Sequence, residues 1–171
     1  MIVLHGDAVL ALLRDEADAG EVAALIRSGE PTRLSALGLA EMIDHLVREL
    51  GTDEDEVLLD LAQLDLLPPL PIDADGAVRA GLLRARHHRK DRPLSLVDCV
   101  TIESARANRA ILASASASVI EVAEAEGPEV RRLSGRRRQR SNSVTTTGSA
   151  YPNDEDGAAK KARESAESSL K

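Results

Sequence analysis

Short runs of β-prone apolar residues alternate along the chain with longer amphipathic stretches. The run at residues 2–4, Ile-Val-Leu, has the composition of a short buried β-strand. On the same grounds we expect further strands at residues 32–35, 70–72 and 111–113, with a possible fifth at residues 129–131.

The amphipathic stretches have the 3.6-residue period of α-helices. In residues 36–50 the apolar stripe falls at positions 39, 43, 46, 47 and 50, and Gly51 ends the pattern. Asp73, Ser95 and Ser118 are of the residue types that cap helix N-termini. Further helices are expected over residues 8–13, 18–28, 52–66, 73–85, 96–107 and 118–127.

Because strands and helices alternate with short connections, the order of elements predicts an α/β fold. Such connections are right-handed crossovers, which give a mostly parallel sheet, here of four or five strands, with helices on both faces. In sheets of this kind, binding sites form at the carboxyl ends of the strands. The functional residues are therefore expected where strands give way to helices.

The character of the chain changes after Leu133. Six arginines fall within residues 131–140, and a Ser/Thr/Asn-rich run follows at residues 141–149. This region has little to bury, so we expect residues 1–133 to fold as one domain and residues 134–171 to form a disordered Arg/Ser-rich tail. Two roles are open for the tail: attraction of an acidic partner or RNA, and a solvated end with no set function.

Aromatic residues are almost absent, and this limits the ways of binding nucleic acid. The 171 residues include no Phe, no Trp and one Tyr, Tyr151, so base stacking on an aromatic platform is excluded. The formal net charge is −7; residues 136–171 hold eight basic and five acidic groups, which leaves 14 basic and 24 acidic groups for residues 1–135. An acidic body needs a metal ion or a local basic patch to contact RNA or DNA.

Cysteine content and hydropathy indicate the compartment. Cys99 is the only cysteine, so neither an intrachain disulfide nor a cysteine-based zinc cluster can form. No apolar run reaches the roughly 18 residues that a membrane span needs, and the N-terminus lacks the basic region of a signal peptide. We expect a soluble, cytoplasmic protein that does not contact the membrane.

The common nucleotide-binding and hydrolase motifs are missing. No glycine-rich phosphate loop follows an expected strand, and the GxSxG nucleophile elbow does not occur. What remains are carboxylates at strand ends and helix starts, and carboxylate oxygens are the ligands that Mg²⁺ and Mn²⁺ prefer. Four places qualify by position: His5 with Asp7, Glu41, Asp98 and Ser116.

Five segments in order carry a family resemblance over residues 1–133. They are MIVLHGDAVLALLRDE, RLSALGLAEMIDHL, PIDADGAVRAGLL, RPLSLVDCV and ILASASASVIEVAEAEG. Together they resemble the PIN-domain family, in particular the VapC-type toxins of bacterial toxin–antitoxin pairs. The resemblance implies a PIN-like three-layer α/β/α sandwich and a ribonuclease that uses Mg²⁺ or Mn²⁺. It also implies an RNA substrate, a homodimer and a cognate antitoxin that blocks the site with a basic side chain.

The resemblance assigns roles to single residues and shows two departures. Glu41 matches the family's helix glutamate, Asp98 matches the acid at a later helix start, and Ser114 matches a hydroxyl after the fourth strand. His5 and Ser116 stand where the family has aspartates, so two of its four carboxylates are replaced. Fewer carboxylates weaken divalent-cation binding, and a neutral imidazole suits Mn²⁺ or Zn²⁺ better than Mg²⁺.

Asp7 offers a partial replacement for the lost carboxylate. Residues 5 and 7 share a face if the strand continues, and the alternative is that Asp7 caps the following helix. On the family interpretation the catalytic residues are Glu41, Asp98 and Asp7, and His5 joins them as a metal ligand.

A dense basic run comes directly before Asp98. It either positions RNA phosphates near the site or forms an exposed, solvated helix end. Its members are Arg84, Arg86, Arg89, Lys90 and Arg92. Two functions are therefore open: a VapC-like metal-dependent ribonuclease toxin weakened by the lost carboxylates, and a catalytically inactive PIN module that binds an antitoxin or RNA.

Overall fold

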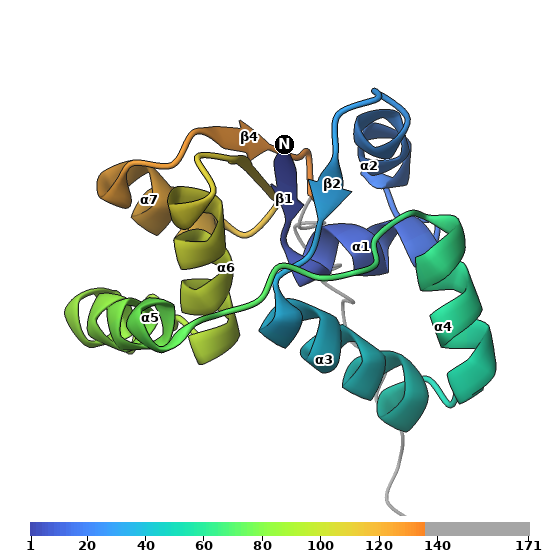
Figure 1. Cartoon of the computed structure of the whole chain (residues 1–171), viewed down its shortest axis with the longest axis horizontal. Coiled ribbons are helices and arrows are strands. Elements are labelled where there is room, and N and C mark those ends of the chain that lie inside the picture. The colour runs from blue at the N-terminus through green and yellow to red at the C-terminus, as the bar shows by residue number, and fades with distance from the viewer. Residues whose placement is uncertain (136–171) are drawn as a thin grey trace, which may run out of the picture. The chain divides into compact units, whose positions relative to one another are not determined.

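A computed structural model of the chain describes residues 1–135 (Figure 1). Apart from Ser134 and Gly135, the tail predicted for residues 134–171 lies outside the described residues. Within residues 1–135, no helix is long and apolar enough to cross a membrane. The cytoplasmic location stays a prediction.

Four short strands form one sheet whose neighbours all run parallel. The spatial order is β2-β1-β3-β4, so β1 and β3 are central and every connection is a crossover. The strands are β1 (Ile2–Leu4), β2 (Thr32–Arg33), β3 (Ile111–Ser114) and β4 (Val130–Arg132). The predicted parallel sheet is confirmed, and the possible strand near residues 129–131 is its fourth member.

The prediction of a strand at residues 70–72 is wrong. Leu70 makes only an isolated parallel bridge to Ser35. Its N–H donates to Leu34 O and its carbonyl accepts from Ala36 N, each at 2.8 Å. The pattern stops there because Pro69 and Pro71 have no N–H with which to continue a ladder.

The helices lie close to the predicted ranges, with two differences. The stretch expected as one helix over residues 36–50 is α-helical only to Asp44 and then π-helical, and the last helix begins at Ala117 rather than at Ser118. The elements are α1 (Gly6–Leu13), α2 (Ala19–Ile26), α3 (Ala36–Asp44), η1 (His45–Glu49), α4 (Glu54–Gln63), α5 (Ala74–His87), α6 (Leu96–Ala107) and α7 (Ala117–Glu126).

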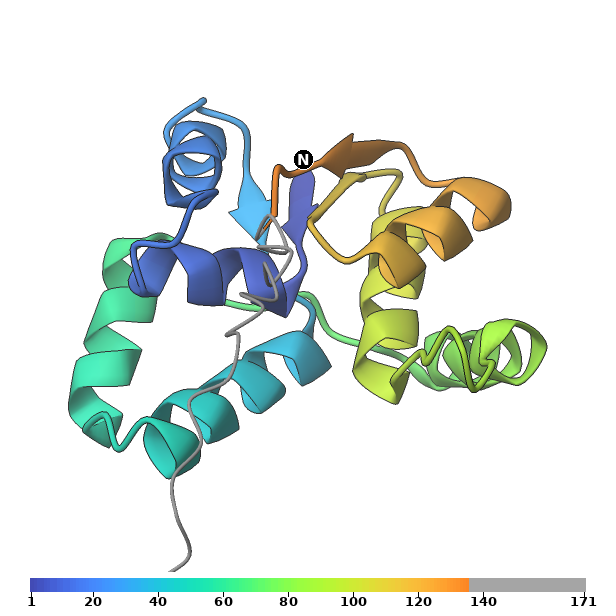
Figure 2. The same cartoon turned by 180° about the vertical axis from the view of Figure 1, so that it is seen from behind.

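Helices cover both faces of the sheet and make three layers. Ile2 and Leu4 point into a core shared with α1, α2, α3 and α4, whereas Val3 and Leu112 point into a core shared with α5, α6 and α7. Figures 1 and 2 show these two groups of helices on opposite sides of the strands. The predicted α/β/α sandwich is confirmed.

Both cores are aliphatic, as the missing aromatics require, so each well-buried leucine carries a large share of the packing. Leu112 of β3 is fully buried in the core shared with α6 and α7, whereas Leu59 on α4 is 57% exposed. We expect Leu112→Ala to lower the free energy of unfolding by about 3 kcal/mol, and the control Leu59→Ala to lower it by less than about 0.5 kcal/mol. Urea unfolding followed by circular dichroism measures both, and a loss below 1 kcal/mol for Leu112→Ala would contradict this packing.

Candidate functional site

His5 stands where β1 ends and α1 begins. Its backbone N–H donates to Ala113 O of β3 at 2.9 Å, so the chain follows the sheet for one more residue before it turns into the helix. His5 occupies the N-cap position of α1, but its side chain makes no capping bond. The imidazole is directed instead along the carboxyl edge of the sheet, where the family site is expected.

Two carboxylates flank the His5 imidazole. Nε2 lies 2.9 Å from Asp98 Oδ1 in an aligned hydrogen bond. Nδ1 lies 2.8 Å from Asp7 Oδ1, in an ion pair that lacks the alignment of a hydrogen bond. The side chains are largely shielded from water, with exposures of 11% for His5, 16% for Asp98 and 35% for Asp7. His5 thus bridges α1 and α6 across 93 residues of sequence.

These surroundings keep His5 protonated at neutral pH. Burial by itself disfavours the imidazolium, but the contacts with Asp7 and Asp98 and the charges of these carboxylates outweigh it. Together they raise the pKa of His5 from 6.5 to about 10. The middle of the site is therefore occupied by a positive charge that belongs to the protein.

Asp98 is held by its own helix as well as by His5. Its Oδ2 accepts the N–H of Ser95 at 2.7 Å, and Ser95 Oγ accepts the N–H of Asp98 at 2.9 Å, which makes a capping box at the start of α6. Burial disfavours the charged carboxylate, but the hydrogen bonds to His5 and Ser95 outweigh it and lower the pKa of Asp98. Both oxygens of Asp98 are therefore engaged.

Glu41 reaches the same place from α3. It lines a cavity of about 360 Å³ together with His5 and Asp7, between α1 and the α3–η1 helix. Burial and the charge of Asp98 raise the pKa of Glu41 above its ordinary value, so the two carboxylates lie within electrostatic range of each other. The structure thus brings together Glu41, Asp98, Asp7 and His5.

A buried hydrogen bond that the sequence did not reveal fixes the two helices that carry these acids. Ser35 Oγ accepts the N–H of Gly38 at 3.1 Å and caps α3, and it lies 2.9 Å from Thr101 Oγ1 of α6. This contact joins the helix of Glu41 to the helix of Asp98. The only sequence signal is a serine before a predicted helix, and it does not identify the hydrogen-bond partner 66 residues away.

The serines after β3 do not replace the missing carboxylate. Ser114 Oγ donates to Asp7 Oδ2 at 3.5 Å and accepts the N–H of Ser116 at 3.0 Å. Ser116 Oγ lies 3.2 Å from Ser118 Oγ. Asp7 lies in the first turn of α1 and makes no capping bond, so its contacts are with His5 and Ser114.

This set of donors does not fit Mg²⁺ or Mn²⁺. In the part of the chain that the structure describes, no group of three or more His, Cys, Asp or Glu side chains is arranged to hold a metal ion. Both oxygens of Asp98 are engaged by Ser95 and His5, and a protonated imidazole has no lone pair to donate. A divalent ion would have to displace the His5 imidazolium against its charge.

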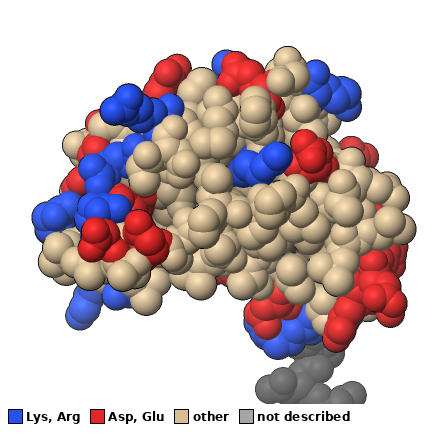
Figure 3. Space-filling model, in the orientation of Figure 1, with Lys and Arg blue, Asp and Glu red and all other residues tan. Residues whose placement is uncertain are grey.

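Two of the five residues of the predicted basic run are paired with acids, and a third is held by a backbone carbonyl. Arg86 pairs with Glu126, Arg92 with Glu121, and Arg84 Nε donates to the Leu94 carbonyl. Arg89 donates only to the His88 carbonyl, and neither Arg89 nor Lys90 has an acidic partner within residues 1–135. In Figure 3 the basic side chains over α5 and α7 are interspersed with acidic ones.

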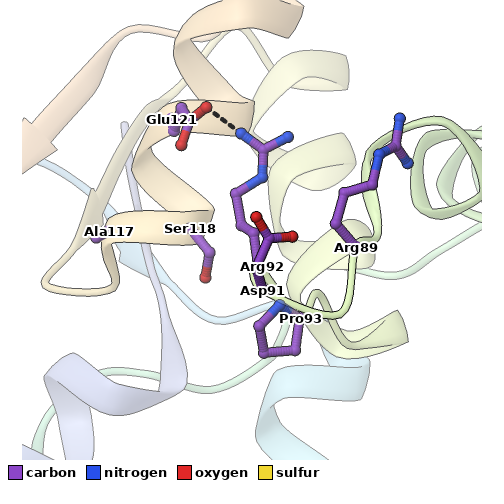
Figure 4. Close-up of a pocket in the computed structure, with 7 residues that line it drawn as sticks. All are labelled: Arg89, Asp91, Arg92, Pro93, Ala117, Ser118 and Glu121. Atoms are coloured by element: carbon purple, nitrogen blue, oxygen red, sulfur yellow. Dashed lines mark hydrogen bonds and ion pairs between the residues drawn. The ribbon is translucent and has the colours of Figure 1, made fainter.

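Arg89, which has no acidic partner within residues 1–135, borders a second cavity. A hollow of about 690 Å³ lies between residues 89–93 and the start of α7 (Figure 4). Figure 4 shows Arg92 reaching Glu121 on one wall, while Arg89 extends away from that pair. Of the five predicted phosphate contacts, Arg89 and Lys90 are the two that are exposed and have no acidic partner within residues 1–135, so their charge is available to a ligand.

The fold and site define an α/β domain with a parallel sheet and an acidic cluster at its carboxyl edge. Residues 2–125 match the PIN domain family, and the chain belongs to that family. No curated protein matches the sequence.

Solved structures with the same fold include FitAcB, VapBC2 and FitAB. FitAcB from Neisseria gonorrhoeae is 20% identical with a TM-score of 0.57, over 76% of this chain and 96% of that chain. VapBC2 from Rickettsia felis, bound to a DNA fragment from their promoter, is 18% identical with a TM-score of 0.57, over 78% and 99%. FitAB bound to IR36 DNA is 19% identical with a TM-score of 0.57, over 77% and 94%. At these identities the likeness shows the fold alone.

The charge of His5 predicts a pH dependence of stability. A group whose pKa rises on folding stabilises the native state fully below its unfolded value, here 6.5, and this stabilisation is lost as the pH rises through about 10. We expect the native chain to exceed His5→Gln in free energy of unfolding by on the order of 3 kcal/mol at pH 6. The difference should shrink toward pH 10 in urea titrations, since titrating groups away from the His5 cluster cancel between the two proteins. A difference that stays constant over this range would contradict a charged His5.

Proposed function

We propose that this PIN domain is a VapC-type member of a toxin–antitoxin pair that works as a binding module, with little or no metal-dependent cleavage. Its ligands on this proposal are a cognate antitoxin and RNA. The toxin–antitoxin complexes among the solved structures of the same fold support the class of partner.

One observation supports the proposed loss of metal-dependent cleavage: the imidazolium of His5 lies between Asp7 and Asp98. Metal-dependent phosphodiester cleavage needs a cation that lowers the pKa of a bound water and neutralises charge on the phosphate. The His5 side chain supplies one positive charge and satisfies the carboxylates, but its protonated ring has no lone pair with which to hold such an ion. The acids are thus engaged in an internal ion pair.

A second candidate function, a slow ribonuclease that uses Mg²⁺ or Mn²⁺, is favoured by Glu41. It lines the cavity beside His5, and burial and the charge of Asp98 raise its pKa, as is common for functional carboxylates. This function requires the His5 ion pair to open and release Asp7 and Asp98.

An RNA-cleavage assay separates the two functions. We compare the native chain with a His5→Asp, Ser116→Asp double variant, using a pool of random-sequence RNA oligonucleotides in Mg²⁺ and in Mn²⁺. The double variant restores both carboxylates and should cleave at least about 100-fold faster than the native chain. The matched control, His5→Asn with Ser116→Asn, has the same shape without the charges and should stay inactive.

Two results would overturn this assignment. Native cleavage as fast as that of the restored variant, and abolished by Asp98→Asn, would show that the native site is an active nuclease. A restored variant that is inert in both metals would show that these residues do not form the family's metal site.

We also propose that the domain forms a homodimer, with α5 contributing to the contact. Val78 and Leu82 lie one turn apart on α5 and are 62% and 54% exposed, and burial of such apolar area favours association. We expect Leu82→Lys to convert a dimer into a monomer in light scattering coupled to size exclusion, and the control Leu59→Lys on α4 to leave it intact. A native chain that is monomeric at all concentrations would refute the dimer.

A further inference from the structure

A further cleft shares Asp7 with the His5 cavity. It has a volume of about 470 Å³ and is formed by α1, the α1–α2 loop, the β3–α7 loop and Ser134 with Gly135. Its acidic side chains are Asp7, Glu16 and Asp18, and its one basic side chain, Arg14, pairs with Glu16 at 3.4 Å. The cleft therefore carries an excess of negative charge.

Asp18 is the residue that marks this cleft as a cation site. It occupies the N-cap position of α2, yet its side chain makes no capping bond, unlike Asp53 and Asp73, which cap α4 and α5. Asp18 is only 3% exposed, and within residues 1–135 its carboxylate has no hydrogen-bond or ion-pair partner. Asp18 lines the cleft, so its negative charge is available to a cation bound there.

The chain itself runs to the rim of this cleft. The N–H of Leu133 donates to Ser114 O at 3.0 Å, and the N–H of Ser134 donates to Glu21 Oε2 at 3.1 Å. Gly135 follows with φ +63°, and a Cβ there would lie 3.2 Å from Ala115 Cβ. These contacts fix where the next residues start, and consecutive Cα atoms are only about 3.8 Å apart.

The next residues in the sequence are Arg136, Arg137, Arg138 and, after Gln139, Arg140. We propose that the cleft beside Asp7 is the docking site of this arginine run of the same chain. A guanidinium binds a carboxylate through two parallel N–H donors and stays charged when desolvated, which suits the buried Asp18. Because the run is tethered at the rim, its effective concentration is in the millimolar range without any other partner.

Docking of the arginine run has a consequence for partner binding. Asp7 lines both the cleft and the His5 cavity, so a docked arginine places a second positive charge beside the imidazolium. A basic segment of any partner then competes with the chain's own arginines for the same acids. This proposal does not depend on whether the domain cleaves RNA.

Paramagnetic relaxation tests the proposal in the full chain. A spin label goes on Ser143→Cys, because the native Cys99 is buried and the pKa of its thiol is raised to about 12, which leaves it unreactive. We expect the label to broaden the amide signals of Ala11 and Ser116, which line the cleft. The broadening should weaken at 1 M salt, where the Debye length is about 3 Å.

Charge variants identify the two partners of the contact. Replacing the four arginines of the run by Gln should weaken the broadening, and Asp18→Asn should also reduce it. The matched control neutralises Lys160, Lys161 and Arg163, which lie further along the same tail, and should leave it intact. Unchanged amide shifts in the helices away from the cleft verify that each variant is folded.

Three outcomes would overturn the proposal. One is broadening between a labelled copy and a separate isotope-labelled copy, which would make the occupant a second chain. Another is broadening that is spread over other faces of the domain. The third is broadening at the cleft that is unchanged by neutralisation of the arginine run.

Discussion

The ion pair of His5 with Asp7 and Asp98 is the interaction on which the carboxyl edge of the sheet depends. Strands β1, β2 and β3 lead directly into α1, α3 and α7 at this edge, and the start of α6 brings Asp98 to His5. Helix N-termini attract carboxylates. Shielded carboxylates that gather in this way repel each other unless a cation lies between them. Here a side chain supplies that cation and ties α1 to α6 at distances of 2.8 and 2.9 Å.

The placement of His5 also shows which electrostatic effect dominates. An imidazolium at the N-cap of α1 is opposed by the positive end of the helix dipole, and its burial removes hydration. Its pKa nevertheless rises to about 10, so the two carboxylates outweigh both effects. The same balance disfavours a metal ion, because the ion would have to replace a charge that the cluster already holds.

The sequence predicted local features well and distant contacts poorly. Strand 2–4 and helix 96–107 have the predicted bounds, because apolar runs and the Ser95 cap are local signals. The prediction of a strand at residues 70–72 was wrong because it gave more weight to the apolar pattern than to the flanking prolines. The roles predicted for Glu41 and Asp98 rest on family resemblance, and neither the His5–Asp98 bond nor the Ser35–Thr101 bond is visible in any periodicity. Likewise, Asp18 resembles an ordinary cap in the sequence, and only the structure shows that it caps nothing.

The two cavities that share Asp7 are electrostatically coupled, and this affects how the site responds to mutation. Replacing His5 by aspartate changes the local charge by about two units at neutral pH, because a protonated imidazole gives way to a carboxylate. The more negative cluster then attracts divalent cations and also the arginines that follow Gly135. A carboxylate-restored site thus gains a metal ligand and a stronger internal competitor at once. On the proposed docking, metal binding by the restored site is expected to rise further when the arginine run is neutralised as well.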